Sequence, residues 1–179
     1  MCIIRIIKAG DISSEEIKAL WEENPHGGGI ALIDSDLNLK VPIRTKDIDL
    51  FEKELFNQLD EKNFKTLVFH MRYRSRGSLN TININPIYIN EETVMFHNGT
   101  LQRYNNDFYS DSLMYVFNEL HSIKELDIEN TDHIKQIKDS LFGNGSRLVF
   151  LQKGKANPLI INNKGIGYWY KNNTQWTSK

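Results

Sequence analysis

The cysteine at position 2 is the residue whose type and place most directly suggest chemistry. Removal of Met1 would leave a thiol and a free α-amine on one residue. An α-amine titrates near pH ~7.7 to 8.0, so it can take the thiol proton and later protonate a leaving amine. Burial as a small residue at the start of a strand is the competing interpretation, because free cysteines are often buried. Cys2 alone leaves both interpretations open.

A second candidate is the turn sequence His97-Asn98-Gly99, which follows a strand predicted over residues 93–96. Asn-Gly is typical of tight turns, so a simple connector is one interpretation. The same turn can direct the Asn98 amide and the Gly99 N–H at one point. Two such donors would stabilise the oxyanion that forms when a thiolate attacks an amide carbonyl.

Two charged residues could bind the ends of an amino-acid substrate. Arg72 closes the apolar run of residues 66–72, and its planar guanidinium suits a carboxylate. Asp111 could pair with a substrate ammonium. A surface ion pair for Arg72 and helix capping for Asp111 are the simpler interpretations.

The five histidines lack the spacing of a metal site, and we expect them to be structural, with His97 a candidate support for its turn. They are His26, His70, His97, His121 and His133. The sequence predicts neither a metal nor a cofactor.

The composition limits the class of protein. A length of 179 residues with 40% hydrophobic residues fits one domain, 1–179, with one large core. The 22 basic and 23 acidic residues nearly cancel, so neither nucleic acid nor an anionic membrane is expected as the main partner. No apolar stretch approaches the ~20 residues that span a bilayer. We therefore expect a cytoplasmic protein.

The hydrophobic pattern predicts strands and helices in an α+β layered fold with mostly antiparallel strands. Strands are expected at 2–8, in a hairpin from Gly27 to Val41, at 66–72 and 93–96, and three more in RLVFLQ, NPLIIN and GIGYWYK. Helices are expected from Ser13 or Ser14 to about Trp21 or Glu23, at 47–59, from Ser110 or Asp111 to about His121, and at 132–142. The polar stretch 73–92 is expected to be a long loop, and such loops usually serve function.

The order of these motifs resembles the class II glutamine amidotransferases. The resemblance rests on Cys2, PHGGGIAL, HMRYRSRG, FHNGTL and YSDS, and extends to the closing GYWYKNNTQWTS, which is similar to the terminal strands of small members. It implies the four-layer αββα sandwich of the N-terminal-nucleophile hydrolases. It also implies hydrolysis of glutamine through a γ-glutamyl thioester.

The resemblance assigns a role to each matching residue. Cys2 would be nucleophile and base, and Asn98 and Gly99 would form the oxyanion hole. Arg72 would hold the α-carboxylate of glutamine, and Asp111 the α-amino group. Ser75 and Gly77 would complete the substrate site, and Gly29 would lie in the strand that faces the nucleophile.

The sequence departs from the family pattern near Arg72. Tyr73 stands where the family has tryptophan, and Ser75-Arg76-Gly77 replaces Thr-His-Gly. Asn85-Pro86 replaces a His-Pro that many members carry. These departures keep the catalytic residues but favour a substrate other than ordinary glutamine.

Three functions follow from these residues. The first is a glutaminase that passes ammonia to a separate synthetase partner. The second is a stand-alone hydrolase of another γ-glutamyl or linear amide, which Tyr73 and Arg76 favour. The third is a catalytically silent binding module on the same fold.

Overall fold

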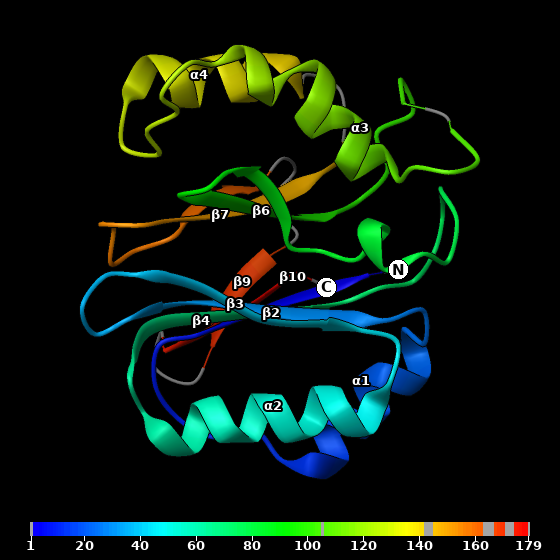
Figure 1. Ribbon diagram of the computed structural model, residues 1–179, viewed down its shortest axis with the longest axis vertical. Helices are drawn as coiled ribbons and strands as arrows, with labels where there is room; N and C mark the ends of the chain where they lie inside the picture. The colour runs from blue at the N-terminus through cyan, green and yellow to red at the C-terminus, as the bar shows by residue number, and fades with distance from the viewer. Residues whose placement is uncertain (1, 105, 142–144, 163–166, 171–173, 179) are drawn as a thin grey trace.

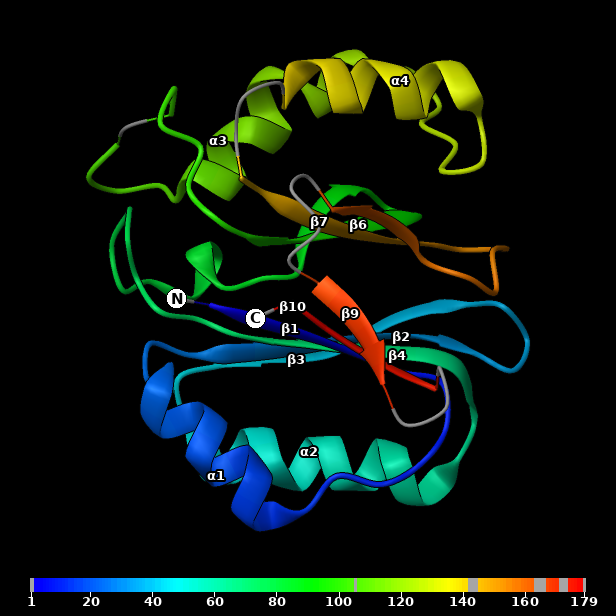
Figure 2. The same cartoon turned by 180° about the vertical axis from the view of Figure 1, so that it is seen from behind.

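The computed structural model describes residues 2–104, 106–141, 145–162, 167–170 and 174–178. Two β-sheets lie face to face at the centre of the molecule, and helices cover the outer face of each (Figures 1 and 2). This arrangement is the four-layer αββα sandwich that the sequence resemblance implied. Every strand pairing between the described residues is antiparallel.

The first sheet has the strand order β3-β2-β4-β1-β10-β9. Its strands are β1 (Ile3–Ile7), β2 (Gly28–Asp34), β3 (Leu39–Thr45), β4 (Phe64–Met71), β9 (Gly167–Tyr170) and β10 (Gln175–Ser178). Helices α1 (Ser14–Glu23) and α2 (Ile48–Glu61) cover its outer face.

The second sheet has the order β5-β6-β7-β8. Its strands are β5 (Ile87–Asn90), β6 (Thr93–Asn98), β7 (Arg147–Gln152) and β8 (Leu159–Asn162). Helices α3 (Asp111–Asn118) and α4 (Thr131–Ser140) cover its outer face. Short 3-10 turns occur at Thr81–Asn83 and Leu120–Ser122.

Local sequence explains where the helices begin. The Ser13 hydroxyl accepts from the Glu16 N–H at the start of α1, and the Asp47 carboxylate caps α2. At α3 the cap is the Ser110 side chain, which accepts from the Leu113 N–H. These side chains satisfy backbone donors that have no partner inside the helix.

Alternation along the strands decides which residues face the middle of the sandwich. On β1, Ile4 and Ile6 pack in the core between the sheets, whereas Ile3 and Ile7 face the helices. On β4, Val68 faces the middle core. Successive side chains along a strand point to opposite faces. The same alternation therefore directs Cys2, just before β1, and Arg72, just after β4, toward the second sheet.

The structure differs from the sequence prediction in three places. Part of the expected loop 73–92 forms strand β5, whose short alternation of buried Ile87 and Ile89 with exposed Tyr88 gives a weak local signal. The last third contains a further strand, β10, which the hydrophobic pattern missed because three of its four residues are polar. Helix α3 ends at Asn118 rather than near His121.

Within the described residues, no helix combines the length and the apolar composition that crossing a membrane requires.

Candidate active site

A cleft of about 300 Å³ opens beside Cys2 at one edge of the two sheets. Its lining comes from four chain segments: Cys2 before β1, the loop after β4, the turn after β6 and the start of β7. The lining residues are Cys2, Tyr73, Ser75, Gly99, Thr100, Gly145 and Arg147. Because neighbouring strands run antiparallel, these strand ends meet at the same edge.

Cys2 is tied to the chain at the end of β4. The Tyr73 N–H donates to Cys2 Sγ at 3.3 Å, and the thiol donates to the Tyr73 carbonyl oxygen at 3.3 Å. Burial raises the pKa of the Cys2 thiol, while the Tyr73 N–H and the Arg72 charge act in the opposite direction. Attack by the thiolate therefore needs a base close to the sulfur.

Of the two predicted hydrogen-bond donors to the oxyanion, one lines the cleft and the other lies in the interior. Gly99 lines the cleft, whereas Asn98 is fully buried and donates its side-chain amide to Ser178. Gly99 has φ +145°, and a Cβ there would lie 3.0 Å from the Cα of Ser146. Only glycine fits this backbone position without strain.

The buried His97 holds this turn through hydrogen bonds of its ring and its backbone. Its Nδ1 lies 2.8 Å from Ser112 Oγ, and its Nε2 lies 3.0 Å from Ser146 Oγ. Its backbone N–H donates to Asn85 Oδ1 at 3.1 Å. Burial lowers the pKa of His97. The structural role expected for His97 agrees with these contacts.

Arg72 is buried and holds the following loop. Its guanidinium donates to the carbonyl oxygens of Ser78, at 3.0 Å, and Arg76, at 2.7 Å. Among the residues that the structure describes, no carboxylate forms an ion pair with it. Burial lowers the pKa of Arg72, and the charges of Cys2 and Asp111 act against this.

Asp111 is the first residue of α3 but does not cap it. Asp111 Oδ2 accepts from the Leu101 N–H at 2.7 Å, and Oδ1 accepts from the Ser112 N–H at 2.9 Å. The carboxylate is thus fixed beside the turn that follows Gly99. Its charge acts in the same direction as burial on the pKa of Cys2, which is raised.

Ser75 and Gly77 have different positions. Ser75 is exposed and lines the cleft with Cys2. Gly77 has φ +72°, and a Cβ there would lie 2.6 Å from the backbone nitrogen of Ser110. Gly77 therefore allows the two loops to approach closely, and it does not line the Cys2 cleft.

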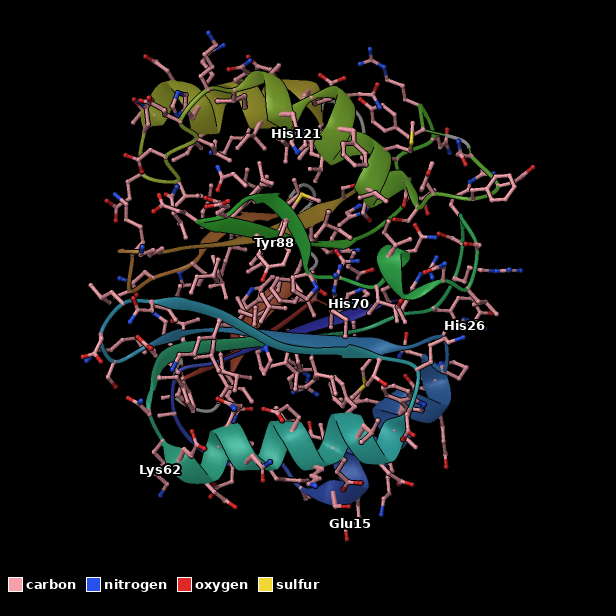
Figure 3. The ribbon with its side chains drawn as sticks, in the orientation of Figure 1. Glu15, His26, Lys62, His70, Tyr88 and His121 are labelled. Atoms are coloured by element: carbon pink, nitrogen blue, oxygen red, sulfur yellow. The ribbon has the colours of Figure 1, made fainter. Side chains whose placement is uncertain are left out.

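Gly29 allows a similar approach in the middle of the sandwich. A Cβ at Gly29 would lie 2.1 Å from the carbonyl oxygen of Asn85, which precedes a cis peptide bond to Pro86. Gly29 pairs with His70 across β2 and β4. Figure 3 shows His70 between the sheets and His26 near the loops at the site edge, where His26 Nδ1 accepts from the Arg74 N–H at 2.9 Å.

Arg147 is the cleft residue that sequence reasoning missed. It begins β7, is buried, and pairs in register with Asn98. The sequence signal that could have found Arg147 was the same as for Arg72: a single arginine at one terminus of an apolar strand. Thr100 and Gly145, which also line the cleft, carry no comparable signal.

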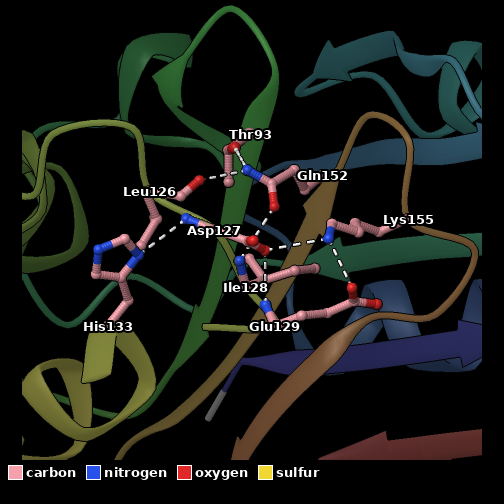
Figure 4. Close-up of polar contacts among 8 residues, drawn as sticks. All are labelled: Thr93, Leu126, Asp127, Ile128, Glu129, His133, Gln152 and Lys155. Carbon is pink, nitrogen blue, oxygen red and sulfur yellow. Dashed lines mark hydrogen bonds and ion pairs between the residues drawn. The ribbon is translucent and has the colours of Figure 1, made fainter. Parts of the chain in front are cut away.

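A separate polar network lies at the other end of β6 and β7 (Figure 4). Gln152 donates to Thr93 Oγ1 at 3.0 Å and accepts from the Ile128 N–H at 3.1 Å. Lys155 forms ion pairs with Asp127 and Glu129. This network joins the loop before α4 to the second sheet, and it does not contribute to the Cys2 cleft. Over the described parts of the chain, no three His, Cys, Asp or Glu residues group to hold a metal.

No protein-family model and no curated protein sequence matches this chain. Solved structures do match it across 99% of its length. The glutamine phosphoribosylpyrophosphate amidotransferase from B. subtilis, solved with ADP and GMP, has a TM-score of 0.52 at 17% identity. An allosteric regulatory enzyme of purine biosynthesis has a TM-score of 0.58 at 14% identity. A glutamine aminotransferase class-II domain protein from Silicibacter pomeroyi has a TM-score of 0.52 at 10% identity.

The share of each matched protein that this chain spans differs among the three. This chain spans 41% of the length of each of the first two proteins and 87% of the third. At these identities the likeness concerns the fold. The chain therefore has the N-terminal-nucleophile hydrolase fold of class II glutamine amidotransferase domains.

Proposed function

We propose that this protein hydrolyses the side-chain amide of glutamine or of a related γ-glutamyl compound, with Cys2 as an N-terminal nucleophile once Met1 is removed. The observation that carries the proposal is the cleft that Cys2 shares with Gly99, on the fold of glutamine amidotransferase domains. Asn98 and Asp111 adjoin this cleft through the turn that contains Gly99.

The reaction uses the groups of the cleft in order. The Cys2 α-amine takes the thiol proton, and Sγ forms a bond to the amide carbonyl carbon. The carbonyl oxygen becomes an oxyanion that accepts hydrogen bonds from the Gly99 N–H and the Asn98 amide. The C–N bond then breaks, and the leaving nitrogen takes the proton from the α-amine. Water cleaves the resulting thioester, which releases glutamate and restores the thiol.

Asn98 has to change partners to act in this step. Both acceptors of its amide nitrogen belong to Ser178, at 3.0 Å and 2.9 Å. An amide nitrogen carries two protons, so one can turn toward the oxyanion while the other stays with Ser178. Gly99 supplies the second donor from the edge of the cleft.

Arg72, Asp111 and Ser75 are proposed to hold the glutamyl group. Arg72 is a buried cation whose hydrogen bonds go to loop carbonyls, so a substrate carboxylate would supply a compensating negative charge. The Asp111 carboxylate is held rigidly by two N–H groups and suits a substrate ammonium. Ser75 adds a hydroxyl at the cleft surface. Gly77 contributes by shaping the loop.

With glutamine as substrate, the first product is ammonia, and we propose a separate ammonia-accepting partner protein. A hydrolase of larger γ-glutamyl amides is the second candidate, and the presence of Arg147 in the cleft favours it.

Ammonia release from L-glutamine tests the proposal. Untagged protein should release ammonia, and the Cys2→Ala protein should release none above background. Glutamine binding without hydrolysis in both proteins would support the silent binding module instead.

A further inference from the structure

His26 precedes strand β2 and lies beside the chain segment that follows β4. In the β2–β4 pairing, Gly28 stands opposite Met71. Two backbone hydrogen bonds continue this pairing beyond the strands. The Arg72 N–H donates to the Gly27 carbonyl oxygen at 2.7 Å, and the His26 N–H donates to the Arg72 carbonyl oxygen at 3.0 Å. The backbone of His26 is therefore fixed against the first residue after β4.

The side chain of His26 holds the same segment further along. Its Nδ1 accepts from the Arg74 N–H at 2.9 Å. Its ring lies edge-on to the ring of Tyr73, with centroids 5.3 Å apart and planes at 63°. Figure 3 shows His26 beside the loops at this edge of the molecule. His26 thus contacts each of the three residues 72–74.

The middle residue of this segment, Tyr73, binds the proposed nucleophile. The Tyr73 N–H donates to Cys2 Sγ at 3.3 Å, and the Cys2 thiol donates to the Tyr73 carbonyl oxygen at 3.3 Å. A hydrogen bond donated to the sulfur favours the thiolate. The Tyr73 N–H accordingly lowers the pKa of Cys2, against the larger effect of burial.

The two peptide groups that flank Tyr73 each join His26 to the sulfur. In the first group, the Arg72 carbonyl accepts from His26 and the Tyr73 N–H donates to Sγ. In the second group, the Arg74 N–H donates to His26 and the Tyr73 carbonyl accepts from the thiol. A peptide group is planar, so fixing one of its polar atoms restricts the direction of the other.

We propose that His26 is a positioning residue for the nucleophile, because it fixes both peptide groups that hydrogen-bond to Cys2 Sγ. The inference rests on the proposed role of Cys2 and adds a residue that acts on it through Tyr73. His26 itself does not line the Cys2 cleft.

The contact with Arg74 requires that Nδ1 of His26 carries no proton, because only an unprotonated ring nitrogen accepts a hydrogen bond. Burial lowers the pKa of His26, and the charges of Arg72 and Arg74 act in the same direction. Both effects favour the form of the ring that accepts the Arg74 N–H.

Alkylation by iodoacetamide reports on the Cys2 thiolate without any substrate turnover. Cys2 is the only cysteine of the chain, so one adduct in the intact mass measures its reaction. H26F keeps an aromatic ring but removes the acceptor. Near neutral pH its alkylation rate should fall about threefold to tenfold, as expected when one hydrogen bond to the thiolate is weakened. The two rates should converge as rising pH ionises the thiol in both proteins.

H26N tests the hydrogen bond itself. The asparagine Oδ1 is bonded to Cγ as the histidine Nδ1 is, so it can accept the Arg74 N–H without the ring. H26N should keep the wild-type alkylation rate within about twofold. H26A lacks both ring and acceptor, should be as slow as H26F, and gives the same comparison where H26F does not fold. A wild-type profile in H26F or H26A, or an equal loss in H26N, would overturn the inference.

His121 provides the matched control. It lies in the turn after α3, and its ring is edge-on to Phe117, with centroids 5.2 Å apart and planes at 87°. H121F should keep the wild-type alkylation profile. A loss in H121F equal to that in H26F would overturn the specific role of His26.

Glutamine turnover keeps this inference distinguishable from the proposed function. H26F should lower kcat more than it changes KM, because His26 acts on the nucleophile and not on substrate binding. Turnover of glutamine with equal alkylation profiles in wild type and H26F would overturn the inference alone. Slower alkylation in H26F, restored in H26N, would support it even in a protein that cleaves no γ-glutamyl amide, and that protein would overturn the proposed hydrolysis alone.

Discussion

Asn98 donates its side-chain amide to Ser178, with Nδ2 lying 3.0 Å from the carbonyl oxygen and 2.9 Å from Oγ. Ser178 Oγ also accepts from the Ile4 N–H at 2.9 Å. Ile4 lies two residues from Cys2. One serine in the last strand therefore connects the proposed oxyanion donor to the strand that carries the proposed nucleophile.

Replacing Ser178 should disturb this connection. S178A removes one acceptor of Asn98 and the acceptor of the Ile4 N–H, so unfolding free energy should fall by about 1 to 3 kcal/mol. We also expect kcat to fall more than KM changes, because the donor is less well placed. Urea unfolding and glutamine kinetics measure both effects. The exposed Ser122, changed to alanine, is the control, and equal results for the two variants would contradict the role of Ser178.

Removing the Asn98 amide should slow the chemical step. N98A should lower kcat by about 10² to 10³, as expected when one oxyanion donor is lost. Substrate binding should change little, because the donor acts on charge that develops in the transition state. Steady-state kinetics will separate kcat from KM. An unchanged kcat would exclude Asn98 from the oxyanion hole.

Arg72 is best tested with a substrate that lacks the group it is proposed to bind. R72K should reduce kcat/KM for glutamine about tenfold or more, because an ammonium cannot replace the bidentate guanidinium. For 4-aminobutanamide, which is glutamine without its α-carboxylate, the same substitution should have a much smaller effect. Equal losses with both substrates would show that Arg72 acts only through the loop it holds.

Alanine substitutions at Gly99 and Gly154 distinguish the cost of backbone strain at positive φ from the cost of steric contact. G99A should lower stability by about 1 to 3 kcal/mol, because Gly99 has positive φ and a Cβ would press on Ser146. Gly154 also has positive φ, but a Cβ there would meet nothing within 4 Å. Thermal unfolding should show a smaller loss for G154A. A G154A loss as large as that of G99A would remove the packing argument at Gly99.

His70 predicts how stability depends on pH. Burial, with a further contribution from Arg72, lowers its pKa from 6.5 to about 3. The unfolded chain binds a proton at His70 below its ordinary pKa and the folded chain does not, so stability falls as pH drops from 6.5 toward 3. The loss from this group is about 1.4 kcal/mol per pH unit in that window. Urea unfolding of wild type and H70L at several pH values measures the slope, and identical slopes would contradict the assignment.

The local parts of this structure could be predicted from the sequence. Ser13, one of the two serines expected to cap the first helix, does so, because a cap needs only residues a few positions away. The αββα arrangement followed from the ordered motifs. Strand β5 was missed because its alternation covers only four residues.

The long-range parts of the site could not be predicted in the same way. The Asn98–Ser178 contact joins residues 80 positions apart, and nothing near either residue indicates it. The position of Arg147 beside Cys2 depends on how the two sheets stack. The role of Gly77 also depends on another loop, since its close neighbour is Ser110.

The most direct test of the central claim is the intact mass of untagged protein before and after incubation with a glutamine-mimicking diazoketone, which alkylates nucleophilic cysteines. Cys2→Ala is the control. We expect loss of Met1 and one adduct in the wild type, with no adduct in the variant. Retained Met1, or processed protein that never reacts, would contradict Cys2 as an N-terminal nucleophile.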